Sequence, residues 1–192
     1  MIWEWGTPLI LETQRYILKS IDPSDFPDDI VKWYADPEVM QHMSDQPNLN
    51  RQQLKNLFNG FNNKTSFALL AFDKENEVPI GIFRIFINTP NARAETSVLI
   101  GNKDYWGERM VFEARTRIQN FLFSAMKLNK ICGYVRARNF PALFNYTRLG
   151  FSKEGVTKEQ VRARDGSFED VIVFGLLRST WQKKRNSEVS AK

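Results

Sequence analysis

The sequence predicts a mixed α/β domain of the α+β type, with about seven strands in a mostly antiparallel twisted sheet and four or five helices. Three strand-like runs, at 66–74, 79–88 and 92–101, are separated only by short turns, as in an antiparallel meander. From Val111 onward the apolar residues recur at helical spacing instead of strand spacing. Strand and helix patterns also occur on both sides of the meander, which indicates a mixed fold.

The chain before the meander is expected to form one strand and two helices. Residues 15–21 alternate well enough for the strand. The next segment predicts a helix that is capped near Ser24 or Asp25 and ends before Pro37. A second helix is predicted over 50–63, because its apolar residues recur at spacings of three and four.

The chain after the meander is expected to alternate between helices and strands. In order, the pattern predicts a helix over 111–125, a strand over 130–137, a short helix over 139–149 and two strands over 151–163 and 168–178. Asn139 can cap the short helix, Pro141 is tolerated in its first turn, and Gly150 can adopt the left-handed conformation that ends it.

Domain organisation and charge point to one domain with a basic tail. Residues 1–182 are expected to form a single domain, and residues 183–192, KKRNSEVSAK, a flexible tail. The formal net charge is +5, and three of these charges fall in the last ten residues. The body is nearly balanced and only mildly basic, which suits a phosphate-bearing small molecule as well as it suits DNA. We do not expect a nucleic-acid partner.

The scarcity of cysteine and histidine excludes two classes of site. The single Cys132 cannot form a disulfide within the chain, and the single His42 leaves no Cys/His cluster of the zinc type, so no metal is expected. The sequence also lacks a recognisable signal peptide and any run of 18 apolar residues. We therefore expect a cytoplasmic protein with no membrane association.

The junction between the third meander strand and the long helix is a candidate anion site. The segment VLIGNKDYWGERMVFEA passes from strand to helix through a polar turn that contains Gly101 and Gly107. Backbone N–H groups and the positive end of a helix dipole can bind a phosphate at such a turn, and Lys103 and Arg109 add positive charge. A glycine-bearing loop without a ligand is the simpler alternative. The turn matches neither a P-loop nor a dinucleotide fingerprint.

Several motifs in a fixed order carry a family resemblance. They are LETQRYILKSIDPSD and WYADPEVMQHM near the start, YWGERMVFEA in the middle, and N-x-x-A-x-x-x-Y-x-x-x-G-F from Asn139 to Phe151. With the closing EGVTKEQVRARDGSFEDVIVFGLLRSTW, the sequence from about Leu11 to Trp181 resembles the GNAT superfamily of acetyl-CoA-dependent N-acetyltransferases. It looks most like the branch of ribosomal-protein N-terminal and nucleotide-amino-sugar acetyltransferases.

The resemblance implies a GNAT fold, acetyl-CoA as cosubstrate and a set of residues that bind it. The implied contacts are Val98, Leu99 and Ile100 for the pantetheine arm and Gly107, Glu108 and Arg109 for the phosphates. Asn139 is a further candidate for the arm. The family's turn is usually Gln/Arg-x-x-Gly-x-Gly/Ala, whereas this sequence has Asp104 at the first position and Arg109 at the last. A carboxylate near a pyrophosphate repels it, and the bulk of Arg109 opposes close approach of the backbone.

Tyr146 matches the family's general acid. A tyrosine phenol, with an ordinary pKa of about 10, is protonated at neutral pH and can donate to a departing thiolate. Packing is the alternative, because Leu143, Tyr146 and Leu149 share one helical face.

Glu95 is the candidate general base, acting through a water molecule, because several family members hold a carboxylate at this position. Alternation places Glu95, Ser97 and Leu99 on one face of the strand, so the role requires that face to be open. An exposed strand carboxylate without a catalytic role is the alternative. His42 is a second candidate base, whereas Glu113 is interpreted as structural and Cys132 as a core residue.

The acceptor is expected to be the primary amine of a small molecule, and a nucleotide-linked amino sugar is placed first. The ending FEDVIVFGLLRSTW looks closest to the nucleotide-sugar members of the family. Four arginines could also meet a diphosphate, although a solvated sheet face explains them equally well: Arg136, Arg138, Arg162 and Arg164. A protein N-terminus is the first alternative. An alternative of another class is a noncatalytic module that binds CoA or nucleic acid. Because exposed strands of this fold often pair, the resemblance also admits a homodimer.

Overall fold

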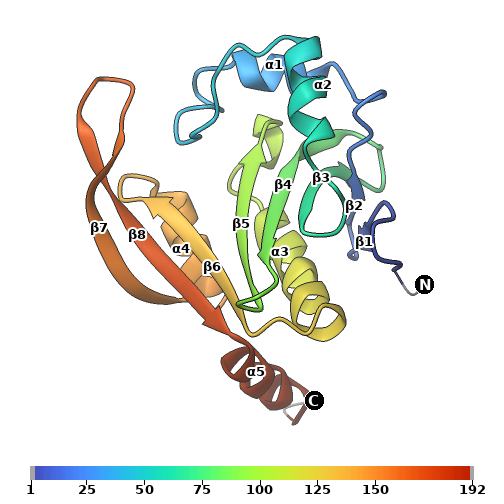
Figure 1. Ribbon diagram of the computed structural model, residues 1–192, viewed down its shortest axis with the longest axis vertical. Helices are drawn as coiled ribbons and strands as arrows, with labels where there is room; N and C mark the ends of the chain where they lie inside the picture. The colour runs from blue at the N-terminus through green and yellow to red at the C-terminus, as the bar shows by residue number, and fades with distance from the viewer. Residues whose placement is uncertain (1–2, 191–192) are drawn as a thin grey trace. The chain divides into compact units, whose positions relative to one another are not determined.

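The computed structural model describes residues 3–190 and confirms the mixed α/β fold, with eight strands and five α-helices in that part of the chain. Figure 1 shows their order. The elements are β1 (Ile10–Glu12), β2 (Tyr16–Ser20), α1 (Asp29–Ala35), α2 (Arg51–Asn59), β3 (Ser66–Asp73), β4 (Pro79–Asn88), β5 (Arg93–Ile100), α3 (Met110–Asn120), β6 (Lys130–Arg136), α4 (Phe140–Arg148), β7 (Ser152–Arg162), β8 (Phe168–Leu177) and α5 (Arg178–Ser190). A 3₁₀ turn, η1 (Lys103–Tyr105), precedes α3, and a π-helix, η2 (Phe121–Ala125), follows it.

The strands hydrogen-bond in the order β1-β2-β3-β4-β5-β6-β8-β7. The pairs β1–β2, β2–β3, β3–β4, β6–β8 and β7–β8 are antiparallel, whereas β5 and β6 are parallel. A parallel pair requires a crossover connection, which α3 and η2 supply between β5 and β6.

The chain divides into two compact units that both include parts of the meander. Unit 1 comprises Met1–Phe86 and Thr96–Arg117, and unit 2 comprises Ile87–Glu95 and Ile118–Lys192. The assignment of residues 1–182 to a single domain stays a prediction.

The core of unit 1 forms where α1 and α2 pack on β3, β4 and β5. Ile30 and Trp33 from α1 and Leu54 and Phe58 from α2 are buried with strand residues such as Leu70. Figure 1 shows α1 and α2 beside one another. The capping box of Asn50 and Gln53 starts α2 as its sequence indicates.

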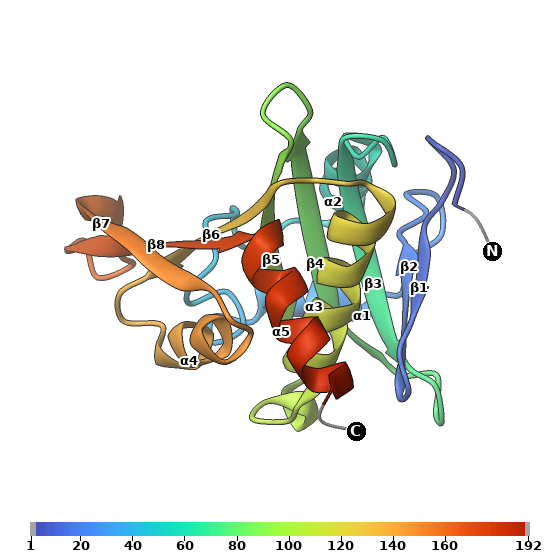
Figure 2. The ribbon, with the colours of Figure 1, turned by 90° about the horizontal axis from the view of Figure 1, so that it is seen from below.

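Unit 2 contains β6, β8 and β7 together with α4 and α5. The β7–β8 hairpin forms a long two-stranded ribbon (Figure 1), and α5 follows the end of β8 (Figure 2). Trp181 of α5 packs against Phe123 of η2, with ring centroids 5.1 Å apart. Because Trp181 is buried, this contact fixes α5 to its own unit.

Two expectations about the first elements were wrong in detail. The strand count is eight instead of about seven, because β1 has three residues, too few for a readable alternation. The first helix begins at Asp29 and not near Ser24 or Asp25. Asp22 accepts hydrogen bonds from the backbone N–H and hydroxyl of Ser24, which hold this segment in a turn ahead of the helix.

The segment predicted to be a flexible tail is largely helical. Residues 183–190 continue α5, and residues 191–192 lie outside the described residues. The described helices include none long and apolar enough to cross a membrane.

Candidate functional site

The turn between β5 and α3 is held at its start by Gly101. A side chain at this position would run into the ring of Trp33 in α1. The N–H of Gly101 donates to the carbonyl of Ile80, 3.0 Å away. The need for glycine at position 101 is therefore explained by close packing within unit 1, and no bound anion is required to explain it.

Gly107 lies at the exposed part of the same turn, in a backbone conformation that favours glycine. Its φ of +79° is a conformation that glycine adopts without strain, and the space beside its Cα is open. Glu108 and Arg109 are also exposed. The N–H of Glu113 makes a helical bond to the carbonyl of Arg109, at 2.9 Å, so the positive end of α3 starts here. These features fit the phosphates of CoA.

Lys103 does not supply the positive charge expected of it in this turn. Its Nζ lies 2.8 Å from Asp36 and 2.6 Å from Glu38, and these hydrogen bonds raise the pKa of Lys103 above its ordinary value. Asp104 is exposed, and its backbone N–H donates to the side chain of Asn102. Arg109 is thus the cation of the turn that suits a phosphate.

The sequence interpretation did not single out Trp106. Its indole N–H donates to the carbonyl of Ile100 at 3.0 Å, and its ring lies beside Lys103. The side chain is nevertheless 40% exposed. The sequence did contain a signal for this residue, because an exposed tryptophan is unusual in a polar turn that contains glycine.

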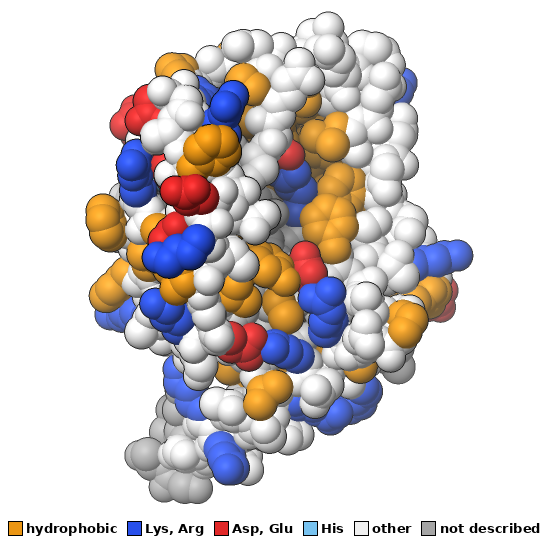
Figure 3. Space-filling model, turned by 60° about the vertical axis from the view of Figure 1, so that its left-hand side comes forward, with side chains coloured by type: hydrophobic (Ala, Val, Ile, Leu, Met, Phe, Trp, Pro, Cys, Tyr) orange, Lys and Arg blue, Asp and Glu red, His pale blue; other side chains and the backbone are white. Residues whose placement is uncertain are grey.

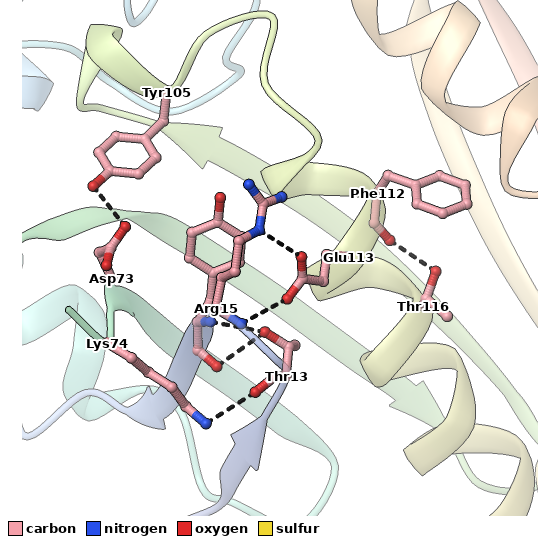
Figure 4. A network of polar contacts seen from close by, with 9 residues as sticks. Thr13, Arg15, Asp73, Lys74, Tyr105, Phe112, Glu113 and Thr116 are labelled. Atoms are coloured by element: carbon pink, nitrogen blue, oxygen red, sulfur yellow. Dashed lines mark hydrogen bonds and ion pairs between the residues drawn. The ribbon is translucent and has the colours of Figure 1, made fainter.

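Glu113 has the structural role predicted for it, and Figure 4 shows why. Its carboxylate accepts from the backbone N–H of Arg15 at 2.9 Å and from Arg15 Nε at 3.0 Å. Burial raises the pKa of Glu113, but hydrogen bonds from Thr13 and Arg15 outweigh it, so the net shift is downward. Glu113 therefore ties the first turn of α3 to the start of β2.

The three candidates for the pantetheine arm lie at the end of β5 in unit 1. Leu99 is buried in the core, whereas Val98 and Ile100 are partly buried. Gly81 of β4 lies so close to the Leu99 carbonyl that a Cβ there would clash with it. Since the implied contacts use backbone groups, burial of Leu99 is compatible with them, and the assignment stays a prediction.

Tyr146 is buried in unit 2, against a strand position that has no side chain. Its ring stacks on Phe174, with centroids 5.1 Å apart, and meets the edge of Phe151 at 4.8 Å. A Cβ at Gly133 of β6 would overlap the ring and hydroxyl of Tyr146. Gly133 therefore lets the phenol reach the strand backbone, as a glycine inside an apolar strand can indicate.

Glu95 belongs to unit 2, like Tyr146, but its side chain lies on the opposite face of the sheet from Tyr146. In the parallel pairing Glu95 is in register with Cys132, so their side chains share a face, whereas the next position, Gly133, faces Tyr146. Glu95 is 40% exposed at its side chain and bonds Arg93 Nη1 at 2.8 Å. Contacts with Cys132 and Glu95 raise the pKa of Arg93.

The two candidate catalytic residues both lie near the point where the pairing of β5 with β6 ends. The register of β5 with β6 runs from Arg93 and Lys130 to Glu95 and Cys132, although both strands continue. Glu95 belongs to this last pair. Gly133, against which Tyr146 packs, follows Cys132 on β6. Two groups on opposite faces of a sheet can serve one reaction centre only where strands separate.

The remaining candidates are placed as follows. The side chain of Asn139 caps α4 by accepting from the N–H of Ala142 at 3.2 Å, which confirms the cap. Its contact with a cofactor stays a prediction, as does a catalytic role for half-buried His42. Cys132 is buried, as expected of a core residue. No group of three or more potential metal-binding side chains occurs within the described part of the chain.

The arginines considered for a diphosphate are partly engaged within unit 2. Arg138 lies 3.7 Å from Asp165 and 3.8 Å from Glu169, and the guanidinium of Arg162 lies over the ring of Phe168. On the face drawn in Figure 3, basic and acidic side chains lie next to one another with hydrophobic side chains between them. That mixture is unlike a continuous nucleic-acid-binding face.

Comparisons with known proteins agree with the fold. The sequence matches the family model of the acetyltransferase (GNAT) domain over residues 15–152. It is 27% identical over 175 residues to a Bacillus licheniformis protein described as uncharacterized N-acetyltransferase p20, covering 88% of this chain and 96% of that one.

Solved structures show the same fold at low sequence identity. Spermidine N-acetyltransferase from Vibrio cholerae, in complex with CoA and spermine, has a TM-score of 0.77 and 21% identity, covering 88% of this chain and 98% of that one. Ribosomal-protein-S5-alanine acetyltransferase from Vibrio fischeri has a TM-score of 0.74 and 18% identity, covering 90% and 98%. The chain therefore belongs to the GNAT family of acetyl-CoA-dependent N-acetyltransferases.

Proposed function

We propose that this protein transfers the acetyl group of acetyl-CoA directly to a primary amine, with Tyr146 as general acid. The backbone at Val98, Leu99 and Ile100 would hold the pantetheine arm, and Gly107, Glu108 and Arg109 the phosphates. The observation that carries the proposal is the position of Tyr146 at Gly133, one residue beyond the last β5–β6 pair.

Acetyl-CoA supplies an activated acetyl group as a thioester. The amine nitrogen bonds to the carbonyl carbon as the carbon–sulfur bond breaks. Tyr146 donates its phenolic proton to the departing thiolate, and Glu95 accepts a proton from the amine through a water molecule. No covalent acyl-enzyme is needed, which agrees with the burial of Cys132.

The proposed acceptor is the amino group of a nucleotide-linked amino sugar. Unit 2, which carries Glu95 and Tyr146, has 15 Lys and Arg against seven Asp and Glu. Such a surplus favours an acceptor with anionic groups over a polyamine, which is itself a cation. The contacts of Arg138 and Arg162 must rearrange if these side chains bind the diphosphate.

A protein N-terminus is the second candidate, because the chain shares its fold with the S5-alanine enzyme. A panel of UDP-linked amino sugar, spermidine and a peptide beginning with alanine separates the classes by release of free thiol from acetyl-CoA. Turnover of the nucleotide sugar at least tenfold above the others is expected. Preference for the peptide or spermidine would show that the proposed acceptor is wrong. It would not contradict acetyl transfer to an amine.

The general-acid role is tested by Tyr146→Phe, which keeps the ring and removes only the hydroxyl. We expect kcat to fall about 100-fold, at the lower end of the range for loss of a proton donor, with little change in unfolding temperature. Turnover like wild type at every pH would show that Tyr146 only packs. Glu95→Gln tests the base in the same assay, and unchanged turnover would direct the search to His42.

Binding of the cofactor can be measured without any acceptor. At about 100 times its Kd, a ligand stabilises the fold by roughly 2.7 kcal/mol. Acetyl-CoA and CoA should therefore raise the unfolding temperature by more than ATP does at the same concentration. An absence of any shift would favour the alternative of a noncatalytic module.

A further inference from the structure

Unit 2 contains a second candidate ligand site, formed entirely by η2, the turn after it and α5. A pocket of about 300 Å³ opens here. Its described lining consists of Phe123, Ser124, Lys127, Arg178, Trp181, Gln182, Arg185 and Asn186. None of the residues assigned to acetyl transfer is among them.

One face of α5 lines this pocket, and its polar residues are largely exposed to solvent. Its residues recur at intervals of three and four, as the face of a helix requires, and they are Arg178, Trp181, Gln182, Arg185 and Asn186. Only Trp181 of this face is apolar and buried, and the polar residues around it can contact a ligand that enters the pocket.

The three cations of the pocket are Lys127, Arg178 and Arg185. Glu188 is the single acidic residue of α5, and no acidic side chain that the structure describes forms an ion pair with any of the three. Arg178 Nε is shielded from solvent without a hydrogen-bond partner among the described residues. A shielded donor left unpaired is costly, which points to a partner that supplies acceptors.

The aromatic wall of the pocket positions one of these cations, Arg185. Trp181 packs on the fully buried Phe123, and the guanidinium of Arg185 lies 4.9 Å from the Trp181 ring. Lys127 has a φ of +56°, a left-handed conformation that is strained for lysine. The π-helix η2, which contributes Phe123 and Ser124, is of a kind frequent at functional sites.

We propose that this pocket binds a small phosphate-bearing compound. Two guanidinium groups and one ammonium match a group with two or three negative charges, and a guanidinium can bind phosphate oxygens with two parallel hydrogen bonds. A phosphate monoester or diphosphate carries that charge at neutral pH, whereas a single carboxylate does not. Ser124, Gln182 and Asn186 add neutral hydrogen-bonding groups.

The test is calorimetric titration of pyrophosphate into the full-length protein saturated with CoA, which keeps the turn after β5 occupied. The variant Arg178→Gln with Arg185→Gln should weaken pyrophosphate binding at least tenfold. Its acetyl-transfer rate should match wild type. Binding with unchanged affinity, or no pyrophosphate binding to wild type, would overturn the proposal.

The matched control is Lys183→Gln with Lys184→Gln, which removes the same charge from exposed positions of the same helix. Its affinity for pyrophosphate should stay within twofold of wild type. A loss as large as that of the arginine variant would show diffuse charge attraction instead of a site.

Lys127→Gly provides an independent variant if the arginine double variant does not fold. It removes the third cation and relieves the left-handed strain, so it should bind pyrophosphate at least threefold more weakly without a lower unfolding temperature. Unchanged affinity would contradict the proposal.

Two further ligands distinguish the chemistry. Citrate should bind more weakly than pyrophosphate, and tighter citrate binding would overturn the phosphate assignment. A short single-stranded oligonucleotide should compete no better than pyrophosphate. Stronger binding that depends on Lys183 and Lys184 would indicate a nucleic-acid surface instead.

Discussion

Units 1 and 2 differ in how they use charged residues. Unit 1 has 12 Lys and Arg against 15 Asp and Glu, whereas unit 2 has 15 against seven. Several pairs of unit 1 join segments far apart in the sequence, such as Arg84 with Asp45 and Arg15 with Glu113. In unit 2, Lys158 and Asp170 join adjacent strands at the surface.

The difference shows that charged residues pair over long sequence distances in unit 1, whereas unit 2 keeps a surplus of cations. The acidic residues of unit 2 are too few to neutralise its cations. Its surplus can attract anionic ligands without disturbing the core, whereas the long-range pairs of unit 1 fix its loops and helices. Variants of each kind should therefore affect different measurements.

The largest effect on stability is expected from Arg84→Met in unit 1. Arg84 is 7% exposed and bonds Asp45 Oδ1 at 2.9 Å. Removing it leaves a partly buried carboxylate without its partner, at a cost of about 3–5 kcal/mol. Urea unfolding measures the loss, and adding Asp45→Leu should recover part of it. A cost below about 1 kcal/mol for the single variant would contradict the claim that long-range ion pairs stabilise unit 1.

A loss of about 1–3 kcal/mol is expected from Gly133→Ala in unit 2, because the methyl group displaces Tyr146. Turnover should fall with it. Gly155→Ala on β7 is the matched control, since the added methyl meets open space there. Comparable stability losses in both variants would mean that close packing of Tyr146 against Gly133 does not explain the effect.

A smaller effect is expected from Glu113→Gln, and it should depend on pH. The folded-state pKa of Glu113 lies below its ordinary value of 4.5, so its contribution is complete above that pH and disappears as the pH falls through the folded pKa. At pH 7 the cost should be at most about 1 kcal/mol, since Arg15 is partly exposed. Unfolding from pH 7 to pH 3 should show the difference from wild type shrinking; a growing difference would reverse the assigned sign.

The smallest effect is expected from Lys158→Met. This residue is 80% exposed at its side chain, and an ion pair in water contributes little to folding. Its urea midpoint should coincide with that of wild type. A clear decrease would show that surface pairs of unit 2 also stabilise the fold.

The features of the candidate site that depend on nearby residues could be predicted from the sequence, whereas those that depend on distant residues could not. Tyr146 could be chosen from its motif, and Gly133 in an apolar strand could have indicated close approach of another group. The pairing of Lys103 with Asp36 could not be read from the sequence, because 67 positions separate them and only the fold brings them together. The face of Glu95 was left open for the same reason, since it depends on pairing with β6.

The sequence by itself determined the caps, turns and element types whose physics acts within a few residues. The side chain of Asn139 caps α4, and Gly150, which has no side chain, follows the end of the helix at φ +90°. Only the tertiary structure decided that residues 178–190 form a helix, because packing of Trp181 on Phe123 stabilises a segment without an apolar stripe. It also decided which cations are paired, because an ion pair depends on distances in space that residue spacing does not specify.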